Sequence, residues 1–269
     1  MNNVNLLVSF QSWFLLKNSY LDWKSAFCSS SFEIINKYPN IILIYRTFLF
    51  AGMIFHFIHG LVTIHPIYEW PIYYTHLTSL VTFFAILFQF IITYRVNFYR
   101  GNDIVPRHSL QYIHMILILI SLGSGLAVSL FYWTILHQTS VRFYSPKIIL
   151  DHGIFWFFLL IDIFLFTRLP FYMIDCIPSV IFAMLYGIFT LLVYLFQWKF
   201  SRNRVGYVYR VFNFNHSPTR VTIQLILFIF VVPFGITWIL WHLFRLRRSI
   251  DVKMNEEKDE EESSSHVLA

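Results

Sequence analysis

The chain has few charged residues, few cysteines and none of the short motifs that mark a nucleotide or metal site. Charged side chains make up 13% of its 269 residues, about half of the roughly 25% found in soluble domains, which argues against a soluble domain. There is no Walker loop, no dinucleotide-binding glycine pattern, no HExxH and no Cys/His zinc spacing, so no cofactor is expected. The two cysteines, Cys28 and Cys176, have neither metal nor redox spacing. Both face the cytosol in the topology below, and no disulfide is expected.

What the chain has in excess is apolar surface. Hydrophobic residues make up 57% of it and aromatic residues 20%, concentrated in stretches of about eighteen or more mostly apolar residues. Each stretch is long enough to cross a hydrocarbon core roughly 30 Å thick, where only a helix satisfies the backbone hydrogen bonds of a single segment. The alternation of a membrane barrel is absent. The sequence therefore predicts an all-α fold, a multi-pass transmembrane bundle of about six helices.

The predicted domain organisation has three parts. Residues 1–40 form a cytosolic arm, residues 41–246 the six-helix transmembrane domain, and residues 247–269 an acidic cytosolic tail. The arm contains an amphipathic patch, 6–16, which fits either an interfacial helix or a loosely docked segment. The tail is acidic and serine-rich over 255–265 and is expected to be disordered. The expected spans are 41–64, 72–94, 112–133, 148–166, 177–198 and 221–244, with tyrosine and tryptophan recurring at their ends.

The distribution of basic residues predicts the orientation. Six spans place both termini on one side, and with the N-terminus inside, the inner segments hold twelve Lys and Arg residues against seven in the outer segments. Both termini are therefore expected in the cytosol, in the endoplasmic reticulum or plasma membrane. The formal charge of +6 comes from basic residues in short loops, which are expected to contact anionic lipid headgroups and to set the topology. No nucleic-acid partner is expected. No cleaved signal peptide is recognised.

Polar residues inside the spans are the candidate functional residues, because they are costly in lipid. Thr75 lies about three residues into the second span and His152 about four residues into the fourth. Since a helix rises 1.5 Å per residue, both lie about 5 Å below the outer interface. If the helices are neighbours, the histidine can deprotonate the threonine for attack on a carbonyl. The alternative is a structural role, in which the threonine hydroxyl bonds to its own helix and the histidine meets water. His59 and His65 lie in the same layer and are alternatives for polar contact there.

Two further groups of residues predict helix contacts. Arg46 and Asp162 each lie about five residues from the cytoplasmic end of their spans, which favours a buried ion pair, with snorkelling of Arg46 as the alternative. The third span carries Gly123, Ser124 and Gly125, small residues that let a neighbouring helix approach closely.

Four segments resemble one known family. The segment 73–80, YYTHLTSL, is similar to the start of the second span in rolling stone proteins and the related androgen-induced, FAR-17a-type membrane proteins. LDHGIFWFFLLIDIFLFTRLP, 150–170, resembles their fourth span, IPSVIFAMLYGIFTLLVYLFQW, 177–198, their fifth, and GYVYRVFNF, 206–214, the motif before the last. The resemblance covers about residues 40–245 in a consistent order.

The resemblance implies six spans, cytosolic termini and a possible chemistry. The androgen-induced members are threonine hydrolases that cleave fatty acid esters of hydroxy fatty acids, and by motif their nucleophile and base correspond to Thr75 and His152. The implied partners are membrane lipids and a fatty acyl ester substrate. The rolling stone branch, which this sequence resembles more closely, is instead associated with myoblast fusion. Three hypotheses follow: a lipid-ester hydrolase, a non-enzymatic protein of cell adhesion or fusion, and a transporter, which the absence of an internal repeat disfavours.

Overall fold

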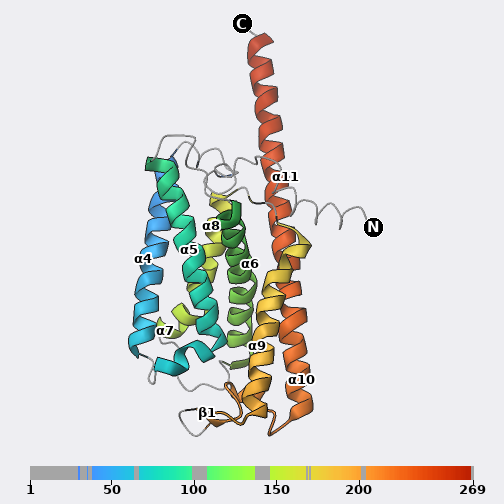
Figure 1. Ribbon diagram of the computed structural model, residues 1–269. Coiled ribbons are helices and arrows are strands. Elements are labelled where there is room, and N and C mark those ends of the chain that lie inside the picture. The colour runs from blue at the N-terminus through green and yellow to red at the C-terminus, as the bar shows by residue number, and fades with distance from the viewer. Residues whose placement is uncertain are drawn as a thin grey trace.

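The computed structural model is a bundle of long apolar helices (Figure 1). It describes residues 30, 35, 38–63, 67–98, 108–136, 146–167, 169, 171–200 and 204–267, with the backbone alone for 251–267. The longer elements are α4 (Pro39–Thr63), α5 (Tyr74–Phe98), α6 (His108–Phe131), α8 (Phe155–Phe166), α9 (Ile177–Leu195), α10 (Pro218–Ile226) and α11 (Val232–Val267). The shorter ones are η1 (Ile67–Ile72), η3 (Tyr132–Leu136), α7 (Pro146–Ile149), η5 (Leu150–Ile154), η6 (Met173–Cys176), β1 (Lys199–Phe200), β2 (Arg204–Val205), η7 (Arg210–Phe212) and η8 (Leu227–Val231).

Six apolar segments have the length or composition of membrane helices, which confirms the predicted fold class. Five are long enough to span a membrane by themselves: Asn40–Val62, Tyr74–Phe98, Ile113–Thr134, Met173–Leu195 and Pro218–Arg247. The sixth, His152–Phe166, is shorter and is extended at its N-terminal side by η5 and α7. Each of the six overlaps one of the expected spans.

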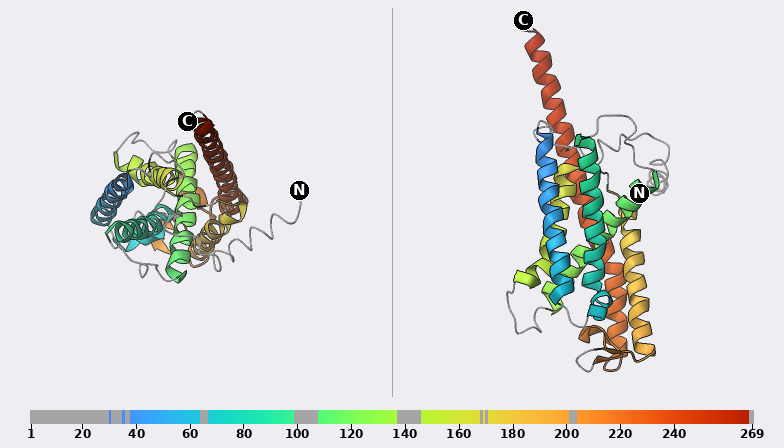
Figure 2. Two further views of the ribbon diagram at one scale, coloured as in Figure 1. Left: turned by 90° about the horizontal axis from the view of Figure 1, so that it is seen from above. Right: turned by 60° about the vertical axis from the view of Figure 1, so that its left-hand side comes forward.

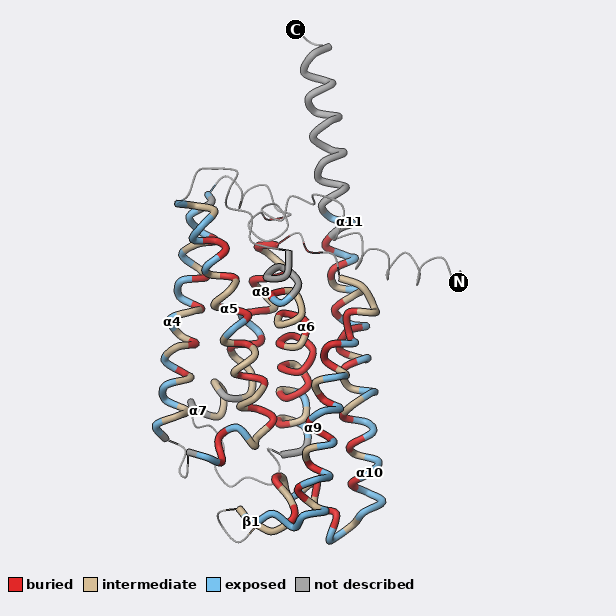
Figure 3. The backbone as a smooth tube through the Cα atoms, in the orientation of Figure 1, coloured by how far each residue is buried: buried red, intermediate tan, exposed pale blue. Residues whose placement is uncertain are grey.

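The distribution of polarity is that of a membrane protein. Large apolar side chains such as Phe48 and Phe55 on α4 are more than 60% exposed on the outside of the bundle. Polar side chains lie inside, and α5 alone buries Thr78, Thr82 and Gln89 to 1% exposure or less. Figure 3 shows the same division, with buried residues along α6 and exposed residues on the outer faces of α4, α9 and α10. Hydrocarbon is the solvent that such a surface fits.

The two ends of the bundle differ. At one end, here called the terminal end, α4 begins and the last turns of α11 project beyond the other helices (Figure 1). At the other, here called the pocket end, α4 ends, α5 begins, and the short β1–β2 hairpin follows α9. The described chain thus enters and leaves the bundle at the same end.

Helix α6 occupies the middle of the bundle (Figure 2) and contacts α5, α8, α9 and α11. The predicted small residues allow this packing. A Cβ atom at Gly123 would lie 2.2 Å from the Ser179 hydroxyl of α9, and one at Gly125 would lie 2.1 Å from the Trp156 ring of α8. The Ser179 hydroxyl donates a hydrogen bond to the Leu119 carbonyl of α6 at 2.8 Å. The close approach expected from the sequence is confirmed.

Arg46 and Asp162 form the ion pair that their depth predicted. Arg46 Nε lies 2.9 Å from Asp162 Oδ1, and the two side chains are 1% and 0% exposed. The guanidinium also donates to the Thr93 hydroxyl and to the Phe166 carbonyl, at 2.5 and 3.2 Å. Because the Arg46 side chain is buried and Asp162 neutralises its charge, Arg46 lies in the interior as one half of an ion pair and does not snorkel to the interface.

A second arginine binds the end of α8. Arg247 of α11 is 5% exposed, and its guanidinium donates to the carbonyls of Ile163, Phe164, Thr167 and Leu169 at 2.8 to 3.1 Å. The carbonyls of Ile163 and Phe164 belong to the last turn of α8, where a helix leaves carbonyls without intrahelical partners, and those of Thr167 and Leu169 follow it. The positive charge also lies at the negative end of the helix dipole, so Arg247 ties α11 to α8.

The C-terminal tail differs from the expectation. The backbone of 255–265 continues α11, which runs without interruption to Val267, where the sequence predicted disorder. Glutamate and lysine are good helix formers, and an existing helix extends without a new nucleation step. On the N-terminal side, most of the predicted arm, including the patch 6–16, lies outside the described residues.

Candidate functional site

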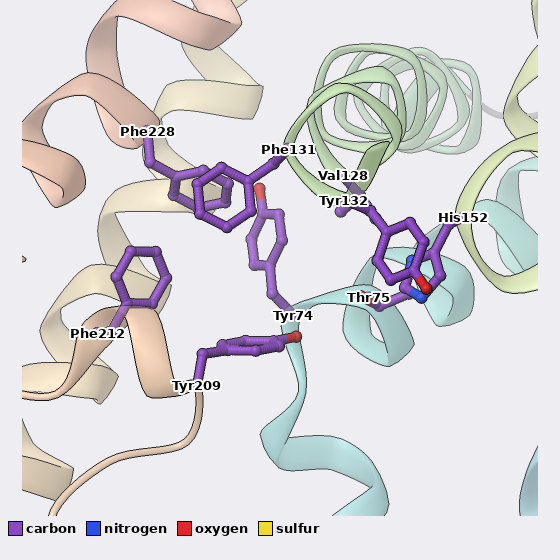
Figure 4. A pocket seen from close by; sticks show the side chains of 9 residues that line it. All are labelled: Tyr74, Thr75, Val128, Phe131, Tyr132, His152, Tyr209, Phe212 and Phe228. Atoms are coloured by element: carbon purple, nitrogen blue, oxygen red, sulfur yellow. The ribbon is translucent and has the colours of Figure 1, made fainter. Parts of the chain in front are cut away.

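The two residues singled out in the sequence, Thr75 and His152, line one pocket at the pocket end of the bundle. Helix α5 contacts both η5 and α8, so the second and fourth spans are neighbours. Figure 4 shows the Thr75 side chain directed toward the side of the pocket where the His152 ring lies. The complete lining is Tyr74, Thr75, Val128, Phe131, Tyr132, His152, Tyr209, Phe212 and Phe228.

Thr75 is positioned by the start of α5. The preceding turn η1 contains Pro71, and the chain then enters α5 at Tyr74. The ring of Tyr74 packs between Phe182, Tyr186 and Phe228 at 4.9 to 5.3 Å, which fixes the first turn. Thr75 is 8% exposed. Its hydroxyl is therefore held at a helix N-terminus, where backbone N–H groups have no partner within the helix.

The His152 ring is held by stacking. It lies face to face with Tyr132, with ring centroids 3.6 Å apart and planes within 5°. Its Nδ1 atom is buried and has no hydrogen-bond partner among the described residues. His56 of α4 and His76 of α5 lie near enough to interact with it electrostatically. The imidazole is thus oriented by an aromatic ring, with one nitrogen available for proton transfer.

Local helix geometry also points to this pocket. The three π-helical turns in the described part of the chain are η3, η5 and η8. Each contributes one residue to the lining: Tyr132, His152 and Phe228 in that order. A π-turn widens a helix by one residue per turn and occurs frequently at functional sites. The three widened turns converge on the site.

The loop between α9 and α10 closes the pocket end through Arg204. The Arg204 guanidinium pairs with Glu69 of η1 at 3.0 Å and donates to the Tyr73 hydroxyl at 2.7 Å and the Val208 carbonyl at 2.9 Å. Tyr209 follows Val208 and lines the pocket. Burial raises the pKa of Tyr209, and nearby hydrogen-bond donors, the Thr75 hydroxyl first among them, oppose the rise.

The remaining lining is apolar. Phe131, Phe212 and Phe228 lie on the side of the pocket away from His152, with the ring of Tyr74 beside them (Figure 4). The cavity measures about 20 Å³, which holds a water molecule but no larger ligand until side chains move. The site therefore has one end with the Thr75 hydroxyl and the His152 imidazole, and an aromatic end that is apolar apart from the buried Tyr74 hydroxyl and that suits a hydrocarbon chain.

The other candidates from the sequence are not at this site. His59 is exposed on α4, beside Phe55 at 6.0 Å between ring centroids. His65 lies outside the described residues, as does the side chain of Asp151. Arg46 and Asp162 form their buried ion pair in the interior near the terminal end and do not line the pocket. Among the described residues, no group of three His, Cys, Asp or Glu side chains is arranged to bind a metal ion.

Sequence reasoning missed three tyrosines that line the site, Tyr74, Tyr132 and Tyr209. Tyr132 lies at the end of the expected third span, 112–133, where aromatic residues are typical of the membrane interface. Tyr209 lies within the 206–214 motif, to which the sequence assigned no role. That motif was the available signal, because a loop rich in hydrophobic and aromatic residues between two spans favours packing against other apolar groups.

Comparison with known proteins adds no assignment: no protein-family model, no curated protein and no solved structure matches the chain. The residues of the pocket themselves therefore define what it can do. A hydroxyl and an unpartnered imidazole nitrogen in one water-sized cavity are the components of nucleophilic acyl transfer.

Proposed function

We propose that this membrane-embedded protein is a threonine hydrolase of lipid esters, with Thr75 as the nucleophile and His152 as the general base. The observation that supports the proposal is that both residues, which come from different helices, line one small pocket. The resemblance to rolling stone and androgen-induced membrane proteins points to the same two residues and to fatty acid esters of hydroxy fatty acids as the substrate class.

The proposed reaction has two steps. Thr75 Oγ1 attacks the ester carbonyl carbon while His152 takes the hydroxyl proton, and the tetrahedral intermediate collapses as the alcohol leaves with that proton. Water then attacks the acyl-threonine ester, His152 takes a proton from the water, and the proton returns to Thr75 as the fatty acid is released. The net reaction consumes one ester and one water and yields one acid and one alcohol.

The apolar end of the pocket is the proposed acyl site. Because the cavity is small, an acyl chain enters only when aromatic side chains such as Phe131 and Phe228 turn aside. We further propose that both termini are cytosolic, in the endoplasmic reticulum or plasma membrane. The pocket end then lies at the outer leaflet, where lipid esters reach the site sideways and water reaches it from the loops.

Labelling with a fluorophosphonate probe tests the nucleophile. We expect wild-type protein in detergent to be labelled, and labelling to be lost in Thr75→Ala and in His152→Ala, because the first lacks the attacking oxygen and the second lacks the base. Thr78→Ala and His59→Ala are the matched controls. Thr78 is buried one turn further along α5 and His59 is exposed on α4, neither lines the pocket, and both variants are expected to label like the wild type.

Two results contradict the proposal. One is folded wild-type protein that never reacts with the probe. The other is a Thr75→Ala protein that retains ester hydrolysis in proteoliposomes. A Thr75→Ala protein that keeps full activity in a cell-fusion assay while the wild type shows no hydrolysis would instead support a non-enzymatic role in adhesion or fusion.

A further inference from the structure

The 206–214 segment has no role in the proposed reaction so far, yet it folds over the pocket. It contributes Tyr209 and Phe212 to the lining. Their rings contact each other, with centroids 6.0 Å apart, and Tyr209 meets Tyr73 edge to face at 5.8 Å. The Arg204 guanidinium holds the segment through the Val208 carbonyl and anchors it to Glu69. Ring contacts with Tyr73 and Phe212, together with the hydrogen bond from Arg204 to the Val208 carbonyl, therefore hold Tyr209 in place.

The hydroxyl of Tyr209 points toward the turn that carries the proposed nucleophile. Figure 4 shows its oxygen directed toward the first turn of α5, which contains Tyr74 and Thr75. Tyr209 and Thr75 also line the same small pocket. Tyr186 adjoins Tyr209, and the Tyr186 hydroxyl itself donates to the Ile72 carbonyl at 2.9 Å. Hydrogen-bond donors therefore converge beside Thr75, at the positive end of the α5 dipole.

Such a place fits the negative oxygen of an ester under attack. When Thr75 Oγ1 bonds to the carbonyl carbon, the oxyanion is attached to the same carbon. A group within reach of Thr75 Oγ1 therefore reaches the oxyanion after a small shift. Tyrosine hydroxyls and backbone N–H groups are both known oxyanion donors, and in a site that excludes water their effect is large.

We infer that Tyr209 is a third catalytic residue, whose phenolic O–H donates a hydrogen bond to the oxyanion that forms when Thr75 attacks. This inference rests on the proposed hydrolase function. No proton is transferred by Tyr209: it shares its hydrogen with the oxyanion and recovers it when the intermediate collapses.

Substitution of Tyr209 by phenylalanine tests the inference in full-length protein, with hydrolysis of a fatty acid ester of a hydroxy fatty acid as the readout. Tyr209→Phe keeps the ring and its contacts and removes only the donor. We expect kcat to fall by a factor of roughly 100 to 1,000, with KM unchanged, because the bond is made only in the transition state. Tyr207→Phe is the matched control, since Tyr207 lies in the same loop and does not line the pocket, and its kcat is expected to stay at the wild-type value.

The outcomes separate this inference from the proposed function. If Thr75→Ala is inactive while Tyr209→Phe has the wild-type kcat, the hydrolase proposal stands and the inference about Tyr209 is overturned. If the wild type itself shows no hydrolysis, both fail.

A fall in kcat that came from a loosened loop would appear as a lower melting temperature than that of Tyr207→Phe. In that case fluorinated tyrosine at position 209, which keeps the hydroxyl and the packing but changes its acidity, is the deciding variant. A changed kcat with unchanged KM and melting temperature supports the inference, and an unchanged kcat overturns it.

Discussion

Replacing Gly125 by alanine tests the packing that places His152 beside α5. A Cβ atom at position 125 would lie 2.1 Å from Cδ1 of Trp156, whereas ordinary contact begins at 3.4 Å. The helices or the indole must therefore separate by more than an ångström. Trp156 is 2% exposed, and its Nε1 donates to the Thr82 hydroxyl of α5 at 3.0 Å. The ring has no free space to move into without losing that bond.

The expected cost combines three effects. Overpacking of a core costs about 1–3 kcal/mol and a buried donor that loses its partner about 1–3 kcal/mol, while alanine gains about 1 kcal/mol over glycine within a helix. We therefore expect Gly125→Ala to lower the free energy of unfolding by about 2–4 kcal/mol. Because Trp156 lies one turn after His152, we also expect fluorophosphonate labelling of Thr75 to fall.

The assay is unfolding in mixed micelles, followed by tryptophan fluorescence. Gly235→Ala is the matched control, because Gly235 lies within α11 and a Cβ atom there meets nothing within 4 Å, so this variant is expected to be as stable as the wild type or up to about 1 kcal/mol more stable. In a Trp156→Leu background, Gly125→Ala should cost much less. If Gly125→Ala is as stable as Gly235→Ala, close packing of α6 against Trp156 does not stabilise the bundle.

The two buried arginines give two further predictions, both measured as free energies of unfolding. Asp162→Asn is expected to cost about 3–5 kcal/mol, because it leaves Arg46 charged and without its counter-ion in the membrane interior. Adding Arg46→Met should restore a large part of that loss. A double variant that is no more stable than the single one would contradict this. Arg247→Leu is expected to cost about 2–4 kcal/mol, since the carbonyls of Phe164, Thr167 and Leu169 lose the donor that Arg247 provides. The control Arg245→Leu, at an exposed position of α11, should stay within about 0.5 kcal/mol of the wild type.

Depth in the membrane was the part of the site that the sequence could predict. Arg46 and Asp162 were placed in one layer by counting residues along their spans, and the structure joins them at 2.9 Å. The same count placed Thr75 and His152 in one layer, and they line one pocket. The method works because a spanning helix runs from one interface to the other with a fixed rise, so residue number gives depth.

Rotation and loop placement were beyond that method. Depth alone does not say which way a side chain faces, and the stacking of Tyr132 on His152 depends on two π-turns that shift the helical register. Tyr209 lies outside the spans, so no count of helical rise gives its position. The helical backbone of 255–265 was missed for another reason: composition indicates the lack of a core, but not whether an existing helix extends into the segment.

The sequence by itself determined that the chain crosses a membrane as a helical bundle, because long apolar segments have no other stable state in hydrocarbon. It also predicted which polar residues share a layer, as Arg46 and Asp162 do. Only the tertiary structure decided which helices are neighbours, how each is rotated and which loop covers the pocket. These depend on contacts between residues far apart in the chain, such as Gly125 with Trp156 and Arg204 with Glu69, and no local pattern encodes them.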